Sequence, residues 1–172
     1  YATTGTNNVA VGYSALTRQT IGSNQTAVGF SALSGNTGTS GTGTENTAIG
    51  SFALGVNTTG SYNSAFGMGA LGANTTGDNN TAVGYQAGYS STIGVRNTFI
   101  GRQAGYSTTT AGELVAVGNA ALYANTTGSY NVALGTSALR NNTTASNNTA
   151  VGYQAGYSNS TSADNTYIGY YA

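Results

Sequence analysis

The chain has 172 residues, a net charge of zero and only 5% charged residues, with no His, Cys, Pro or Trp. The missing cysteines exclude a disulfide framework and thiolate metal sites, and four Arg without any Lys exclude the clustered cations that bind nucleic acid. No apolar run approaches the roughly 18 residues of a spanning helix, so we expect no direct membrane insertion by this segment.

One glycine recurs along the chain and defines a repeating unit. Its positions are 17 residues apart except for a step of 21 between Gly29 and Gly50, and the four extra residues fall near Thr37–Thr42. We therefore predict a single array of ten units over residues 1–172, and a fragment of a longer chain because both ends fall inside a unit. The register glycines are Gly12, Gly29, Gly50, Gly67, Gly84, Gly101, Gly118, Gly135, Gly152 and Gly169.

A short strand is predicted just before each register glycine. In Asn80-Thr81-Ala82-Val83-Gly84, a period of two places Thr81 and Val83 on one face and Ala82 on the other. Because valine replaces the threonine in two units, we predict that the Thr and Val face points inward, with the aliphatic residue as a buried core column. That column is Val11, Val28, Ile49, Phe66, Val83, Ile100, Val117, Leu134, Val151 and Ile168.

Two further columns follow the register glycine. Alanine stands three residues after it in every unit, from Ala15 to Ala172, which predicts a position with no spare room. Leucine or glycine comes next. The leucines are expected in the interior or near subunit contacts, and they are Leu16, Leu33, Leu54, Leu71, Leu122 and Leu139.

The unit favours an all-β fold. Its Gly and Asn content penalises helices, and parallel stacking of one unit on the next predicts a β-solenoid with about 4.8 Å per rung. One or two buried aliphatics per unit return about 1.5–3 kcal/mol each, against about 1–2 kcal/mol of backbone entropy per ordered residue. The thin interior therefore predicts assembly, most simply as a parallel homotrimer.

The strand motifs resemble those of a known class of proteins. Asn8-Val9-Ala10-Val11-Gly12 and Asn46-Thr47-Ala48-Ile49-Gly50 are similar to the head repeats of YadA-like trimeric autotransporter adhesins and to related phage tail-fibre repeats. The resemblance covers the whole chain. It implies a left-handed β-roll, three parallel chains and a surface that binds a host receptor or matrix molecule. The repeat here is longer than the usual one, and the chain carries no neck, stalk or anchor.

Catalysis and cofactors are not expected. The four acids Glu45, Asp78, Glu113 and Asp164 belong to different units, so no carboxylate pair, nucleophile–base pair or metal cluster can be drawn. Calcium solenoids need acids at fixed places in every turn, whereas most units here have none. We predict a protein that is not an enzyme and needs no cofactor or metal.

Three polar or aromatic columns are candidates for surface roles. Tyr89, Tyr106, Tyr123 and Tyr157 share one position and form either a carbohydrate-binding stripe or a structural ring stack. Asn57, Asn74, Asn125, Asn142 and Asn159 are sequons at one shared position, and so are candidate glycosylation sites or corner residues. A third column of Asn precedes the strands, as at Asn63 and Asn80, and predicts a buried ladder of amide hydrogen bonds.

These features favour a structural or adhesive fibre on a cell surface or virion. The alternative is an extracellular filament, with the sequons as candidate glycosylation sites, in which the rod is itself the polymer. Ice binding is a third hypothesis, prompted by the threonine column that begins at Thr58 and Thr75. It requires a flat array two threonines wide, whereas neighbours such as Thr58 and Thr59 point to opposite faces of a strand.

Overall fold

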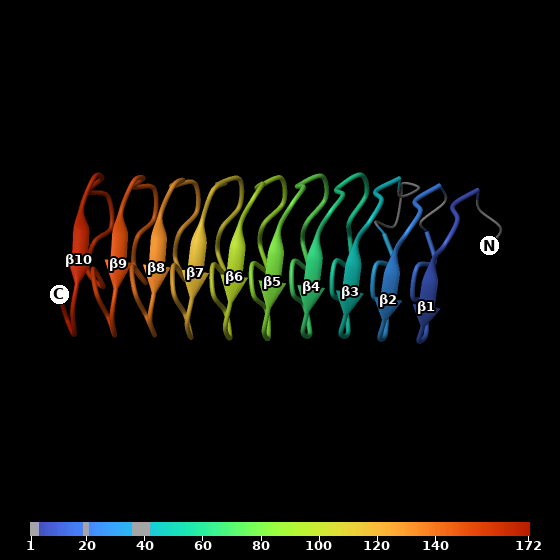
Figure 1. Cartoon of the computed structure of the whole chain (residues 1–172), viewed down its shortest axis with the longest axis horizontal. Coiled ribbons are helices and arrows are strands. Elements are labelled where there is room, and N and C mark those ends of the chain that lie inside the picture. Colours follow the sequence, from blue (N-terminus) through green and yellow to red (C-terminus); the bar gives the residue numbers. More distant parts are fainter. Residues whose placement is uncertain (1–3, 19–20, 36–41) are drawn as a thin grey trace.

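The computed structural model describes residues 4–18, 21–35 and 42–172. These residues form ten three-residue strands and no helix, and the strands stand side by side in one parallel sheet that follows the chain order (Figure 1). The strands are β1 (Val9–Val11), β2 (Thr26–Val28), β3 (Thr47–Ile49), β4 (Ser64–Phe66), β5 (Thr81–Val83), β6 (Thr98–Ile100), β7 (Val115–Val117), β8 (Val132–Leu134), β9 (Thr149–Val151) and β10 (Thr166–Ile168).

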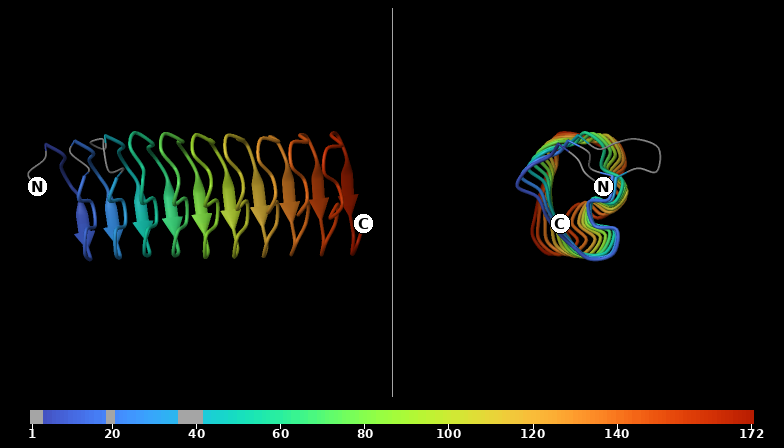
Figure 2. Two further views of the ribbon diagram at one scale, coloured as in Figure 1. Left: turned by 180° about the vertical axis from the view of Figure 1, so that it is seen from behind. Right: turned by 90° about the vertical axis from the view of Figure 1, so that its right-hand side faces the viewer.

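Each strand belongs to one turn of a rod, which confirms the predicted β-solenoid. Thr81 pairs with Thr98, and most neighbouring strands pair residues that are likewise 17 positions apart. Between β2 and β3 the paired residues are Thr26 and Thr47, so the register absorbs four extra residues. The predicted insertion near Thr37–Thr42 lies outside the described part except for Thr42, since residues 36–41 are not described. Viewed along the axis, each turn is one indented loop stacked on the next (Figure 2).

The register glycine is required where the chain leaves the strand. Gly84 has a φ of +133°, and a Cβ placed on it would lie 2.6 Å from the carbonyl oxygen of Gly101 in the next turn. A side chain would therefore meet both an unfavourable backbone conformation and the backbone of the neighbouring turn. This double constraint explains why the sequence keeps glycine in every unit.

Small side chains and leucines fill the interior. Ala82 at the centre of β5, Ala87 in the following turn and Leu71 have no exposed surface. The predicted burial of the alanine and leucine columns is therefore confirmed through the middle of the rod. Ala15 and Leu16, in the first turn, are only partly buried.

The aliphatic column is not the core, and this part of the sequence interpretation was wrong. Alternation was assigned correctly, since Thr81 and Val83 share a face, but Ala82 is the residue that points inward. The inner face packs against alanines and leucines, which leaves no space for a larger side chain where the facing position is leucine. The side chains of Ile49, Val83 and Ile100 are each 39% exposed.

The asparagine column ahead of the strands forms the predicted ladder. Asn80 is fully buried, and its Nδ2 donates to the carbonyl oxygen of Gly94 at 2.8 Å. Its Oδ1 accepts the backbone N–H of Asn97 at 3.0 Å, in the next turn. Asn63 supports the backbone N–H of Asn80 in the same way at 2.9 Å. The amides thus satisfy backbone groups at a corner where the strands provide no partner.

Candidate interaction surface

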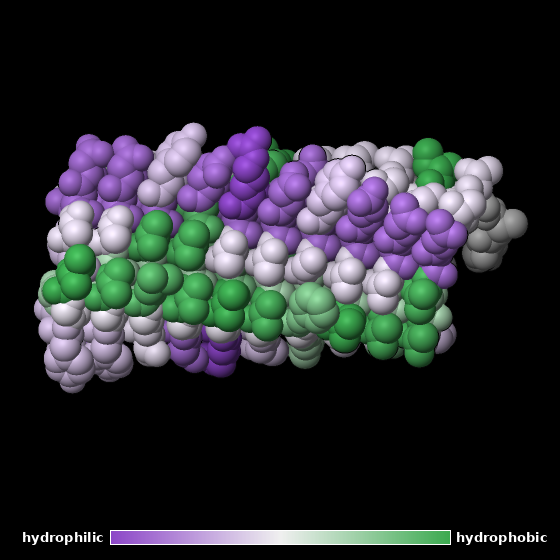
Figure 3. Space-filling model, viewed as in Figure 1, coloured by the Kyte–Doolittle hydropathy of each residue, from purple (hydrophilic) through white to green (hydrophobic). Residues whose placement is uncertain are grey.

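The outer face of the sheet carries a continuous apolar stripe, which we call the aliphatic column. It consists of Val11, Val28, Ile49, Phe66, Val83, Ile100, Val117, Leu134, Val151 and Ile168, the residues that the sequence analysis assigned to the core. Figure 3 shows the stripe crossing the strands along the whole rod. No described residue of the chain covers it, because these side chains are exposed or half-buried in every turn.

The column is regular because the parallel register repeats it. Ile49 pairs with Phe66, and Phe66 pairs with Val83, so each side chain stands directly beside its equivalent in the next turn. Nine steps of about 4.8 Å make a stripe roughly 43 Å long. A column of threonine, valine and one serine runs parallel to it two residues earlier in each strand, as at Thr81, Val115 and Ser64.

The tyrosine stripe is a stack of rings. Tyr89 and Tyr106 have centroids 5.6 Å apart and planes 9° from parallel, and Tyr106 and Tyr123 are 5.2 Å apart at 7°. Arg140 holds the next position and places its guanidinium 4.9 Å from the Tyr123 ring centroid. Because the rings cover one another, the predicted structural stack is confirmed for three members, and their inner faces cannot bind sugar. Tyr157 follows Arg140 and does not join this stack.

The stack ends at Tyr89, beside a hollow that we call the ladder gap. Small residues hold the tyrosine position in the three preceding turns, namely Ser34, Gly55 and Gly72. The hollow has a volume of about 410 Å³, and Tyr89 and Phe52 contribute to its wall. At Gly55, a Cβ would meet no atom closer than the carbonyl oxygen of Phe52 at 3.1 Å, so the gap exists because side chains are missing.

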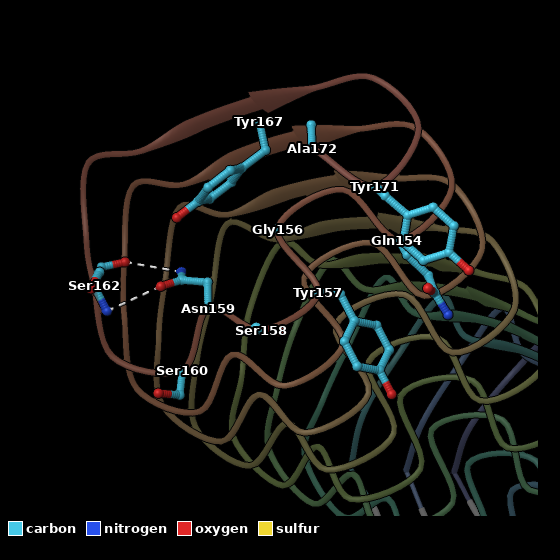
Figure 4. Close-up of a pocket in the computed structure, with 10 residues that line it drawn as sticks. All are labelled: Gln154, Gly156, Tyr157, Ser158, Asn159, Ser160, Ser162, Tyr167, Tyr171 and Ala172. Atoms are coloured by element: carbon cyan, nitrogen blue, oxygen red, sulfur yellow. Dashed lines mark hydrogen bonds between the residues drawn. The ribbon is translucent and has the colours of Figure 1, made fainter.

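A second hollow lies in the last turn of the described rod. It has a volume of about 590 Å³, and Tyr157, Tyr167 and Tyr171 help to line it (Figure 4). On its floor, Asn159 and Ser162 are joined by two hydrogen bonds of 3.0 and 3.2 Å. The described residues that line it include no charged side chain.

The predicted glycosylation column lies mainly inside the fold. Asn57 and Asn142 are fully buried, and Asn57 Nδ2 donates to the carbonyl oxygen of Gly60 at 2.8 Å. Attached sugar would have no space there, so this prediction was wrong for Asn57, Asn74, Asn125 and Asn142, whereas Asn159 is half-buried. The sequence signal that was missed is the glycine or alanine three residues later. Its carbonyl oxygen accepts a hydrogen bond from the side-chain amide of the asparagine. The sequons at Asn24, Asn79 and Asn147 are the exposed ones.

The charged residues act singly or in structural pairs. Arg96 and Glu113 form an ion pair between neighbouring turns, and the hydrogen bond to Glu113 raises the pKa of Arg96. Asp78 accepts the backbone N–H of Ser61 at 2.7 Å. In the same manner, hydrogen bonding to Tyr153 raises the pKa of Tyr171. Among the described residues, no three acidic, His or Cys side chains gather into a metal site.

The threonine column considered for ice binding forms hydrogen bonds from each turn of the rod to the next. Thr58 Oγ1 donates to the carbonyl oxygen of Thr75 at 2.9 Å, and Thr75 Oγ1 donates to that of Thr92 at 3.0 Å. These side chains are half-buried, whereas the neighbouring Thr59 is exposed. Because each hydroxyl proton is committed within the rod, this column does not present a free donor array.

Comparison with known proteins gives this chain no family. No family model matches the chain, no curated protein matches it, and no solved structure matches it. The described residues contain no helix with the length and hydrophobicity needed to span a membrane. The features that bear on function are the aliphatic column and the polar, almost uncharged surface around it.

Proposed function

We propose that this chain is a segment of a non-enzymatic, extracellular fibre that assembles as a parallel homotrimer through the aliphatic column and mediates attachment. The observation that carries the proposal is the unbroken apolar stripe on the sheet (Figure 3). A soluble rod gains nothing from aliphatic residues on every outer strand, since hydroxyls and amides would serve there equally well. A contact that repeats with every turn explains why the pattern extends along the whole rod.

The energy available to such an assembly grows with the length of the rod. Val83 is 39% exposed in the single chain. Covering it completely in an assembly would therefore gain about two fifths of the free energy of burying a valine, or roughly 0.6–1.2 kcal/mol. Ten such residues contribute on the order of 6–12 kcal/mol per chain. The loss of translational and rotational freedom, about 4–15 kcal/mol, occurs only once per association. Each additional turn therefore favours the assembled fibre.

A parallel three-fold arrangement fits the column better than an antiparallel pair. Rotation about an axis along the rod places each residue at the same height as its own equivalents, so Phe66 meets Phe66 and Leu134 meets Leu134. An antiparallel pair would set large residues against small ones. The stripe is one side chain wide, and two neighbouring chains cover both of its flanks.

The adhesive part of the proposal rests on the sequence. The strand motifs resemble those of YadA-like adhesin heads and phage tail fibres, and a surface with 5% charged residues suits a fibre exposed to solvent outside the cell. A host receptor, a matrix component or a surface carbohydrate is the partner that such a fibre would bind.

Light scattering coupled to size exclusion tests the assembly. We expect the chain to elute with the mass of three copies, and a Val83→Asp, Ile100→Asp variant to elute as a folded monomer, because both residues lie outside the single-chain core. A matched variant, Thr59→Asp, Thr76→Asp, places two charges on exposed positions of neighbouring turns away from the column and should stay trimeric. A stable folded monomer of the unmodified chain would contradict the proposal.

A further inference from the structure

The tyrosine stack stops at the ladder gap, so Tyr89 has a stacked ring on one side only. Tyr106 covers that side, and on the other side the edge of the Tyr89 ring lies against Gly69 and Gly72, with no ring of the described residues stacked there. Tyr89 remains 37% exposed and Phe52 is 49% exposed. Two aromatic side chains from different turns therefore face the same hollow of about 410 Å³.

Polar groups without charge complete the lining. Ser31 and Ser34 contribute hydroxyls, and Ser34 Oγ donates to the carbonyl oxygen of Gly55 at 3.0 Å, which leaves that hydroxyl oxygen able to accept. None of the described residues that line the hollow is an Arg, Asp or Glu. A charged ligand would find no counter-charge here, and a wholly apolar ligand would leave the hydroxyls and backbone carbonyls unpaired.

We propose that the ladder gap binds a neutral oligosaccharide, with one sugar ring set against Tyr89 and Phe52. A pyranose has an apolar face for the aromatic rings and a rim of hydroxyls for Ser31, Ser34 and the exposed backbone. The volume lies within the roughly 300–1,000 Å³ typical of small-molecule sites. The site is thus the end of the tyrosine ladder and not the ladder itself.

This inference rests on the proposed function in taking the rod as an attachment fibre, and it names the chemistry of the partner. It depends on different residues, since no lining residue of the ladder gap belongs to the aliphatic column. Sugar binding and trimer formation can therefore be measured separately on the same sample.

The test uses saturation-transfer NMR on the whole chain with maltotriose, cellotriose and chitotriose as probes. We expect transfer to at least one of them, with binding weakened about tenfold or more in two variants. Tyr89→Ala removes the ring, and Gly55→Tyr extends the ladder into the gap. A Tyr130→Ala variant removes an exposed corner tyrosine and should bind as the unmodified chain does.

The outcomes separate cleanly. Absence of transfer to all three sugars, from a chain whose circular dichroism is that of a folded β-protein, would overturn the inference, whatever the oligomeric state. Binding that survives Gly55→Tyr and Tyr89→Ala would place the sugar elsewhere and overturn it too. Transfer to N-acetyltyrosinamide in place of the sugars would assign the gap to an aromatic side chain of a protein partner. A monomer that binds sugar through Tyr89 would contradict the trimer alone.

Discussion

The ring of Phe99 occupies the space that Gly105 leaves free. A Cβ on Gly105 would lie 2.2 Å from ring Cε1 of Phe99, and a Cβ on Gly88 would lie 2.5 Å from Cδ2. In most other turns the strand centre is alanine and the facing position is leucine, as at Leu71 and Leu122, whereas Tyr167 at the centre of β10 again faces a glycine, Gly156. At Phe99 the strand centre carries the large side chain and the facing position, Gly105, carries the small one, so the interior keeps its packing.

This exchange predicts a strong coupling between the two sites. Phe99→Ala should destabilise the rod by about 3–5 kcal/mol, because it leaves a cavity. Gly105→Leu alone should also destabilise it, because the new side chain meets the ring. The double variant restores the usual pairing of alanine with leucine and should be more stable than either single variant. Urea unfolding followed by circular dichroism gives the cycle, and simple addition of the two losses would contradict the compensation.

The sequence predicted most of the fold because its constraints are local and repeated. Constant glycine at one position and constant alanine three residues later indicate close approach of neighbouring turns, and the structure confirms both at Gly84 and Ala87. The amide ladder followed from Asn at a fixed place ahead of each strand, and Asn80 confirms it.

Which face of the strands points into the interior could not be predicted in the same way. Alternation defines two faces without saying which is inside, and ranking by hydrophobicity selected the wrong one. Size variation was the better signal, because Phe66 replaces valine in the aliphatic column without a compensating change, whereas Phe99 on the inner face requires glycines beside it. The ladder gap was missed because it depends on which turns lack a tyrosine.

The register glycine gives a second prediction. Gly84→Ala should lower the free energy of unfolding, because its Cβ would lie 2.6 Å from the carbonyl oxygen of Gly101 at a φ of +133°. Gly55→Ala is the matched control, since its Cβ would meet nothing closer than 3.1 Å and its φ is not in the left-handed region. Thermal melting of both variants decides the matter. Equal melting temperatures would show that the turns can move apart at Gly84.

The invariant alanine should tolerate no larger residue. Ala87 has no exposed surface and lies among the packed residues of the interior, so Ala87→Leu should cost about 1–3 kcal/mol through overpacking. Thr76→Leu adds a comparable volume at an exposed position and serves as the control. Denaturant unfolding compares the two. An unchanged midpoint for Ala87→Leu would mean that the interior has room that the packing does not reveal.

The asparagine ladder predicts a contrast between adjacent residues. Asn80→Ala should destabilise the rod by about 1–3 kcal/mol, because it leaves the backbone N–H of Asn97 and the carbonyl of Gly94 buried without that partner. Asn79→Gly, one residue earlier at an exposed position with a φ of +59° that glycine accepts, should have little effect. Amide hydrogen exchange at Asn97 provides the direct measurement. Protection that is equal in the two variants would show that the ladder does not hold this corner.

The last prediction concerns a break in the second asparagine column. Asn74 donates to Asn57 Oδ1 at 2.8 Å, but the next turn carries Ser91, whose shorter side chain does not continue the ladder. Asn74 Oδ1 and Ser91 Oγ are both buried without a hydrogen-bond partner. Such groups lose hydration without compensation, at a cost of about 1–3 kcal/mol each when no water reaches them.

Ser91→Asn should therefore stabilise the rod. The new Nδ2 can donate to Asn74 Oδ1, as Asn74 does to Asn57, and to the carbonyl of Gly94, as Asn74 does to Gly77 at 3.1 Å. We expect a higher melting temperature for Ser91→Asn. The melting temperature of Ser90→Asn should not rise, because position 90 lies outside the column. Asn159 already holds the equivalent position in a turn with the same glycine three residues earlier, so the backbone accepts the residue. A lower melting temperature for Ser91→Asn would show that the interior has no room for the longer side chain at this point of the column.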